Sequence, residues 1–258
     1  MLSFLGARIA GSKAGRYWLS KLSNHEAFQP LFDIMANRVA SGLRTLRRLG
    51  FSPDLVVDVG AHTGTWTRMA LPYFPAARFV MIEAQSQHEP ALRAVQASAP
   101  SRVTYRIGLL GSESKAAVEF RLAGTGSSLY PENTAFPQQP TTLAMTTLDG
   151  ALGPDHGSRR IFLKLDVQGA ELEVLAGAAL ALQRTEVILL EASLVEYNLG
   201  APRVAEVISR LRELDFLLFD VWDLRRIGAV LAQSDLVFVR RGSMLETAAA
   251  SIIRAYGR

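Results

Sequence analysis

Acidic side chains stand at the ends of apolar runs that alternate with helical patterns. Asp58 lies in the run 55–60, Glu83 closes the run 78–84, and Asp166 closes the run 161–167. Ligands of open α/β sheets bind beyond the carboxyl ends of the strands. These three carboxylates are therefore candidates for ligand binding or for proton transfer.

A glycine loop follows Asp58 and leads into a helical pattern. Glycines at 60 and 64 let the backbone approach a ligand closely, and the start of a helix presents free amide groups. A dinucleotide fingerprint would need glycine at 62 and 65, where His62 and Thr65 stand, so the pattern disfavours a pyrophosphate site. A loop histidine more often bonds to nearby backbone than acts in catalysis.

Glu83 stands 25 positions after Asp58 at the end of the second predicted strand. An acid at this position can accept hydrogen bonds from both hydroxyls of a ribose. Together with the glycine loop, it predicts a site for adenosine or a similar nucleoside that lacks a pyrophosphate.

Lys164 and Asp166 lie on one face of a predicted central strand, because side chains alternate with a period of two. A lysine inside an apolar strand needs a partner, and Asp166, Glu191 or Asp58 can supply it. Glu191 closes the neighbouring run 186–192, so its carboxylate is expected to converge with that of Asp166. Glu171, on the following helix, is expected to be structural.

The elements that position these residues begin at residue 51. The alternation of strands and helices predicts a mainly parallel sheet with helices on both faces. The last two strands have no helical pattern between them, which favours an antiparallel final pair. Predicted strands cover 55–60, 78–84, 103–110, 161–167, 186–192, 216–222 and 236–240, and helices cover 65–71, 86–98 (with a Ser86-x-x-Glu89 capping box), 170–182 and 202–214.

About fifty residues separate the third and fourth of these strands. The segment contains strand-like runs at 117–122 and 141–148 around a loop rich in glycine, serine and proline. Long connections in compact domains are usually functional. We expect this insert to shape a site.

Composition and charge exclude several classes of protein. The 258 residues include no cysteine, which excludes disulfides, thiolate zinc sites and a cysteine nucleophile. The net charge is +4, but residues 1–50 carry eight basic and two acidic side chains, so the basic balance belongs to one end and disfavours nucleic-acid binding. No run suits a membrane span or a signal peptide, and the expected location is the cytoplasm.

Residues 1–50 hold two helical stretches, and the second runs from Pro30 to Leu49 before Gly50. This helix is either a packing element with a basic outer face or a lid over a substrate. The N-terminal helices are also candidates for a contact between copies of the chain. Glycines weaken the first stretch as a helix on a membrane surface.

The run 162–178, FLKLDVQGAELEVLAGA, resembles the signature of the FkbM family of S-adenosylmethionine-dependent methyltransferases. The loop DVGAHTG resembles the first cofactor motif of that family, and residues 127–129, 147–149 and 234–240 also match its pattern. The resemblance covers roughly residues 50–243. The family usually has asparagine where His62 stands and often proline where Ala84 stands, so contacts to the methionine part and to adenine are expected to differ.

This resemblance implies an α/β class I methyltransferase fold, a Rossmann-like three-layer sandwich whose seven-stranded sheet has an antiparallel last strand. The implied organisation is an N-terminal helical extension or lid (1–50), a methyltransferase domain (51–243) with an inserted hairpin or substrate loop (110–160), and a C-terminal tail (244–258). The implied cofactor is S-adenosylmethionine, with Glu83 at the ribose, and with Ala84 and Gly108 near the adenine. The methionine part would lie among Asp58, Gly60, Ala61, His62 and Gly64.

The implied reaction is methylation of a hydroxyl oxygen on a small molecule, such as a sugar or a polyketide-like acceptor. Asp166 is the first candidate to hold or deprotonate the acceptor, and Glu191 is the second; alternatively, Asp166 binds the amino group of the cofactor. The two carboxylates either share a proton near Lys164 or bind Mg²⁺. The metal-free version is favoured, because no third carboxylate is evident in the sequence beside them.

Two other functions remain open at this point. A nicotinamide-dependent oxidoreductase would use the same fold class, although the missing second glycine disfavours it. A non-catalytic methyltransferase-like protein would bind a membrane or a partner through its basic N-terminus.

Overall fold

The computed structural model describes residues 38–153 and 160–256. The chain forms two compact units, Met1–Arg44 and Thr45–Arg258, and the boundary falls within helix α4 (Arg38–Arg48). Most of the predicted N-terminal extension, residues 1–37, lies outside the described residues. The second unit contains every strand and every later helix that the structure describes.

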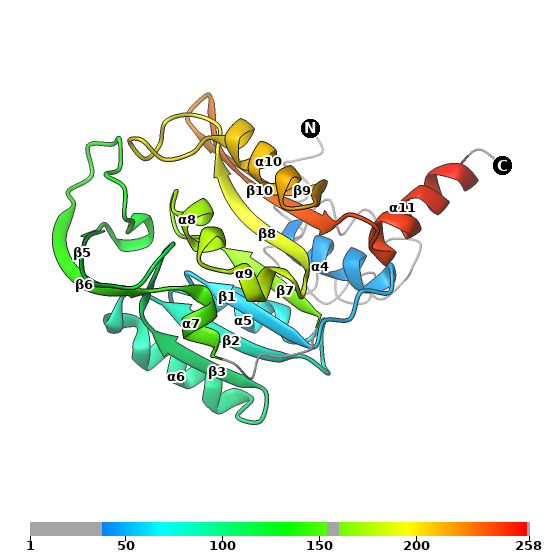
Figure 1. Ribbon diagram of the computed structural model, residues 1–258, viewed down its shortest axis with the longest axis horizontal. Coiled ribbons are helices and arrows are strands. Elements are labelled where there is room, and N and C mark those ends of the chain that lie inside the picture. Colours follow the sequence, from blue (N-terminus) through cyan, green and yellow to red (C-terminus); the bar gives the residue numbers. More distant parts are fainter. Residues whose placement is uncertain (1–37, 154–159, 257–258) are drawn as a thin grey trace, which may run out of the picture. The chain divides into compact units, whose positions relative to one another are not determined.

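A seven-stranded sheet forms the centre of this unit (Figure 1). Its spatial order is β3-β2-β1-β7-β8-β10-β9, and the five strands from β3 to β8 run parallel. The chain reaches the edge as β9 and then returns as β10, which is antiparallel to both of its neighbours. The predicted parallel sheet with an antiparallel last strand is confirmed. The strands are β1 (Leu55–Val59), β2 (Arg78–Glu83), β3 (Val103–Ile107), β7 (Ile161–Leu165), β8 (Thr185–Ser193), β9 (Phe216–Ile227) and β10 (Val230–Arg240).

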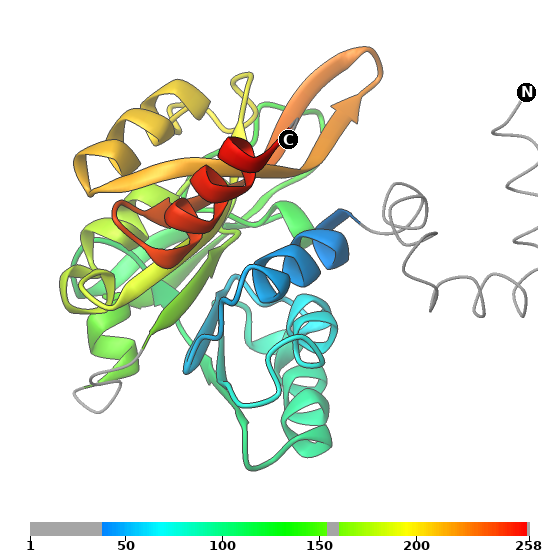
Figure 2. The ribbon, with the colours of Figure 1, turned by 90° about the vertical axis from the view of Figure 1, so that its right-hand side faces the viewer.

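Helices cover both faces of the sheet, as Figure 2 shows with the sheet seen nearly edge-on. The alternation along β7 sorts side chains between two cores: Leu163 and Leu165 pack with α8, α9 and α10, whereas Phe162 meets Trp66 of α5 edge to face. One face therefore carries α5 (Thr65–Ala70) and α6 (Glu89–Ser98). The other carries α8 (Glu171–Ala176), α9 (Ala179–Leu182) and α10 (Val204–Glu213), and the chain closes with α11 (Met244–Ala255).

The insert between β3 and β7 forms a second, three-stranded sheet of order β4-β6-β5. Strands β5 (Lys115–Leu122) and β6 (Gln139–Thr146) pair antiparallel, and β4 (Leu109–Leu110) joins β6 in parallel. Leu109, Phe120 and Met145 form its own small core. A short helix, α7 (Leu148–Leu152), leads back towards the main sheet.

Two elements that the sequence predicts as continuous are each divided in the structure. The predicted strand 103–110 is two strands, because Gly108 donates its N–H to the carbonyl of Glu83 and the chain then leaves for the second sheet. The predicted helix 170–182 breaks at Gly177, where a Cβ would lie 2.2 Å from the carbonyl oxygen of Gly111.

The predicted capping box at Ser86 is wrong. Ser86 opens a short 3-10 turn, η1 (Ser86–His88), and α6 begins at Glu89 with no side chain capping its first turn. The carboxylate of Glu89 instead accepts hydrogen bonds from Tyr105 and Arg93. Glu89 therefore connects the first turn of α6 to β3 through Tyr105, and it does not act in a capping box with Ser86.

Candidate functional site

A cavity opens where β1, β2 and β7 end, and the inserted sheet closes one of its sides. Six residues singled out in the sequence line it: Gly60, His62, Glu83, Ala84, Gly108 and Asp166. The insert contributes Leu109, Leu110, Phe120, Gly124, Thr125, Ser127 and Leu129. The sequence predicted that the insert shapes a site, but apart from residues 127–129, which match the family pattern, it did not single out these lining residues.

The two glycines of the loop have different roles. Gly60 has φ +71°, and a Cβ there would lie 1.8 Å from the carbonyl oxygen of Asp166, so only glycine allows the end of β1 to pass beside the end of β7. Gly64 has φ +74°, and a Cβ there would lie 2.7 Å from Val95 of α6. Gly64 therefore serves helix packing. Neither Gly64 nor the buried Ala61 lines the cavity.

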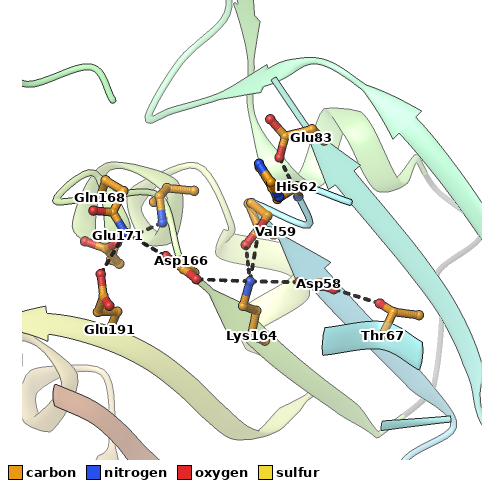
Figure 3. A network of polar contacts seen from close by, with 12 residues as sticks. Asp58, Val59, His62, Thr67, Glu83, Lys164, Asp166, Gln168, Glu171 and Glu191 are labelled. Atoms are coloured by element: carbon orange, nitrogen blue, oxygen red, sulfur yellow. Dashed lines mark hydrogen bonds and ion pairs between the residues drawn. The ribbon is translucent and has the colours of Figure 1, made fainter. Parts of the chain in front are cut away.

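Glu83 is fixed in the cavity wall by two backbone amides, of which Figure 3 shows that of His62. Its Oε2 accepts the N–H of His62 at 2.7 Å, and its Oε1 accepts the N–H of Gln85 at 2.9 Å. The residue is only 5% exposed, so these bonds hold its carboxylate in one orientation. Each oxygen retains a further lone pair for a ligand.

His62 adopts φ +49° and its ring contacts that of His88 in a tilted arrangement, with 3.9 Å between the ring centroids and 52° between the ring planes. Partial burial, together with the neighbouring charge of His62, lowers the pKa of His88 and outweighs the opposite effect of Glu83. A neutral His88 ring therefore supports the loop that borders the Glu83 carboxylate.

Lys164 lies between two carboxylates beneath the cavity (Figure 3). Its Nζ is 2.9 Å from Asp58 Oδ1 and 3.6 Å from Asp166 Oδ2, and it donates to the carbonyl of Gly60 at 3.0 Å. Burial lowers the pKa of Lys164, but the two carboxylates outweigh this effect and raise it. The ammonium thus stays charged and braces the glycine loop.

Asp58 does not line the cavity, although the sequence placed it beside a ligand. It is 1% exposed, and its Oδ2 accepts the hydroxyl of Thr67 at 2.7 Å while its other oxygen contacts Lys164. Its carboxylate is therefore occupied by the protein's own groups.

Asp166 and Glu191 converge, but through an amide that lies between them. The Nε2 of Gln168 donates to Asp166 Oδ1 at 3.0 Å and to Glu191 Oε1 at 2.7 Å. The Nε2 of Gln233 also donates to Glu191 Oε1, at 2.6 Å. No direct hydrogen bond joins the two carboxylates in the described chain, so the bridge is Gln168 and not a shared proton.

The two carboxylates differ in environment. Burial raises the pKa of Glu191 well above its usual range, and the charges of Asp166 and Asp235 add to this effect. Burial thus favours the protonated form of Glu191 relative to an exposed glutamate. The Asp166 side chain, by contrast, is 41% exposed and faces the cavity.

Sequence reasoning missed two polar residues of this network. Gln168 lies within the signature run and adopts φ +54°. A polar residue in a loop between a strand and a helix was the feature of the sequence that could have indicated it. Asp235 pairs with Glu191 across β10 and β8, and burial, followed by the charges of Asp166 and Asp223, raises its pKa to about 6. Among the described residues, no three acidic or histidine side chains are arranged to hold a metal ion.

Glu171 has the structural role expected from the sequence. Its carboxylate is buried and accepts the N–H groups of Val167 and Gly169, which fixes the loop that carries Gln168. Burial raises the pKa of Glu171 to about 7.

Comparisons with known proteins identify one family. The model described as "Methyltransferase FkbM domain" matches residues 58–218, which is more than half of the chain. No curated protein matches.

None of the helices in ranges 38–153 and 160–256 combines the length and hydropathy of a membrane span.

Solved structures of methyltransferases are similar in fold. The FkbM methyltransferase from Methylobacillus flagellatus KT shares 19% identity with a TM-score of 0.47, and the match covers 73% of this chain but only 44% of that one. An O-methyltransferase family protein from Burkholderia thailandensis shares 12% identity (TM-score 0.44; 90% and 61% covered). Magnesium protoporphyrin IX methyltransferase from Synechocystis PCC 6803, solved with bound SAM, shares 11% identity (TM-score 0.43; 91% and 95% covered).

Proposed function

The chain belongs to the FkbM methyltransferase family, and from this premise we propose that it transfers a methyl group from S-adenosylmethionine to a hydroxyl oxygen of a small molecule. The observation that carries the proposal is one cavity with two walls: Glu83, held by two amides, on one side and the accessible carboxylate of Asp166 on the other. The first suits a ribose, and the second suits an acceptor hydroxyl.

The residues of the cavity fit the cofactor. The oriented carboxylate of Glu83 offers lone pairs to two ribose hydroxyls. Gly108 lines the cavity, and a Cβ added there would meet no atom within 4 Å, which leaves open space for a flat base. The loop at Gly60 and His62 borders the same space and would face the methionine part.

When bound, S-adenosylmethionine supplies a methyl group on a positively charged sulfur, whose C–S bond breaks as the new C–O bond forms, leaving a neutral thioether. An alcohol is a poor nucleophile until its proton leaves. Asp166 would accept that proton, since it is the exposed carboxylate of the pair. Glu191, which is buried, would position Asp166 through the shared amide of Gln168.

Calorimetry with the full chain tests the cofactor. We expect S-adenosylmethionine and S-adenosylhomocysteine to bind and NAD not to bind. Glu83→Gln should weaken binding about 10- to 150-fold, because hydrogen bonds to a charged group contribute about 1.5–3 kcal/mol. Glu113→Gln, a change of the same type at an exposed acid, is the control. Tight NAD binding, or unchanged affinity in Glu83→Gln, would contradict the proposal.

Single-turnover methyl transfer tests Asp166, with labelled cofactor and a hydroxyl acceptor identified by screening. Asp166→Asn is nearly isosteric and should retain cofactor binding while the rate falls about 10²- to 10⁴-fold. Glu191→Gln should lose far less, because Glu191 does not line the cavity that Asp166 faces and a glutamine side chain can still accept the hydrogen bond from Gln168 through its oxygen. Full activity in folded Asp166→Asn would exclude Asp166 as the base, and activity abolished by a chelator and restored by Mg²⁺ would replace the base with a metal ion.

A further inference from the structure

A second cavity lies directly beside the first. Its volume is about 250 Å³, and it shares Thr125 and Gln168 with the cavity proposed to hold the cofactor. A water molecule takes about 30 Å³ of liquid volume, so this space suits a small polar molecule. Its remaining walls include Glu132, Phe136, Tyr197 and Arg225.

The shared residue Gln168 connects this space to the carboxylates. Its amide donates to Asp166 and to Glu191, and its side chain lines both cavities. A molecule in the second cavity would therefore extend past Gln168 to the cavity into which Asp166 faces.

The acidic residue of the second cavity already has partners. The carboxylate of Glu132 accepts the hydroxyls of Tyr197 and Thr134, and no ion pair joins it to Arg225 in the described chain. Burial, followed by the bond to Glu132, raises the pKa of Tyr197 to about 12, so its phenol stays a donor. The Glu132 carboxylate thus has its hydrogen bonds from the hydroxyls of Tyr197 and Thr134.

The basic residue has no such partner. Arg225 lies on β9 near the hairpin, and its guanidinium makes no hydrogen bond or ion pair among the described residues. It lines the cavity together with Tyr197 and Glu132. A guanidinium fork matches carboxylate and phosphate oxygens bidentately, so a wall of this kind is suited to an anion.

Phe136 supplies the apolar part of the same space. Its ring is 72% exposed in the described chain and lines the cavity. Such a ring offers contact area to the hydrocarbon body of a ligand. The cavity thus combines an apolar surface, hydroxyl and amide groups, and one cation without a partner among the described residues.

We propose that the second cavity binds the methyl acceptor and that Arg225 recognises a carboxylate or phosphate group on it. The acceptor is then a hydroxylated small anion, held at one end by Arg225 with its hydroxyl directed past Gln168 towards Asp166. This inference rests on the proposed methyl transfer and specifies its substrate class.

Nuclear magnetic resonance of the ¹⁵N-labelled full chain tests it with three matched three-carbon probes: D-glycerate, glycerol 3-phosphate and glycerol. Each is titrated with and without S-adenosylhomocysteine, and the amides of Thr125, Gly126 and Arg225 are followed. We expect at least one anion to shift these amides saturably in the millimolar range, at least tenfold more tightly than glycerol. Glycerate alone assigns a carboxylate, glycerol 3-phosphate alone assigns a phosphate, and both together support the anion class.

Arg225→Gln should abolish the preference for the anion. Arg226→Gln removes the same charge from the next residue of the strand, whose guanidinium bonds to Ala229 at the hairpin and does not line the cavity, so it should keep the preference. Both variants should bind S-adenosylmethionine as the wild type does, which also verifies their fold.

Three results would overturn the inference: no shift with either anion, glycerol binding as tightly as the anions, or a preference that survives in Arg225→Gln. If S-adenosylmethionine binds while the anions fail, only the acceptor class is wrong. If S-adenosylmethionine itself does not bind the wild type, the proposed function fails instead.

Discussion

Replacing Lys164 by methionine should destabilise the fold severely, because it leaves a buried carboxylate without its cation. Asp58 is 1% exposed, and Lys164 Nζ lies 2.9 Å from it. At an effective dielectric constant of 20, two unit charges at that distance attract each other by about 6 kcal/mol. Removing one partner of a buried pair typically costs about 3–5 kcal/mol, out of a total stability of about 5–15 kcal/mol for a domain.

Urea denaturation at pH 7, followed by tryptophan fluorescence, measures this loss as a lower midpoint at an unchanged slope. The double variant Asp58→Asn/Lys164→Met should recover much of it, because neither charge then remains and the new side-chain amide can still accept the hydroxyl of Thr67 through its oxygen. Arg93→Met, which breaks the exposed pair with Glu89, should leave the midpoint unchanged.

Two outcomes would refute this reasoning about Lys164. A midpoint in Lys164→Met equal to that of the wild type would mean that Asp58 does not depend on the ammonium. A double variant no more stable than the single one would mean that the loss comes from packing or from the bond to Gly60, and not from an uncompensated charge.

Three further predictions concern the same site. The pKa of Glu171 in the folded state is about 7, above its ordinary value, so the protonated carboxyl contributes to the free energy of unfolding in full below about pH 4.5. This contribution, up to about 3 kcal/mol, is lost as the pH rises through 7. Glu171→Gln should flatten this pH dependence when unfolding is measured by denaturant at a series of pH values. Burial raises the pKa of Glu191, so the wild-type methyl-transfer rate should decline as this carboxyl ionises at a pH above its ordinary range, and Glu191→Gln should remove that decline; an unaltered pH profile would contradict the assignment. Gly60→Ala should cost more stability than Gly228→Ala. Both glycines have a positive φ, which costs an alanine about 1–2 kcal/mol, but only at position 60 would the new Cβ meet the backbone of Asp166. Equal thermal midpoints of the two variants would argue against that contact.

The sequence alone predicted the features that depend on neighbours along the chain. The alternation of apolar runs and helical patterns indicated a parallel sheet, because a period of 2 or 3.6 is a local property. The same logic placed Glu83 and Asp166 at strand ends, and strand ends of a parallel sheet lie on one side. The signature run around Lys164 indicated the family before any fold was known.

Tertiary structure decided which partner each polar group has. The sequence left Lys164 with three candidate partners, and the register of β1 against β7 brought it to Asp58, with Asp166 farther away. It left Asp166 and Glu191 with either a shared proton or a bound Mg²⁺, and the conformation of the loop at Gln168 places an amide between them.

Arg225 is the clearest case of a polar residue whose surroundings the sequence did not predict. Register shifts between β9 and β10 change which side chains lie opposite one another along these strands, and a one-residue change in register exchanges the two faces of a strand. Simple alternation along β9 therefore does not predict that Arg225 lines a cavity with residues of the distant insert. Periodicity determines which elements form, whereas contacts between residues far apart in the chain determine where each charge lies, because they depend on register, bulges and loop conformation together.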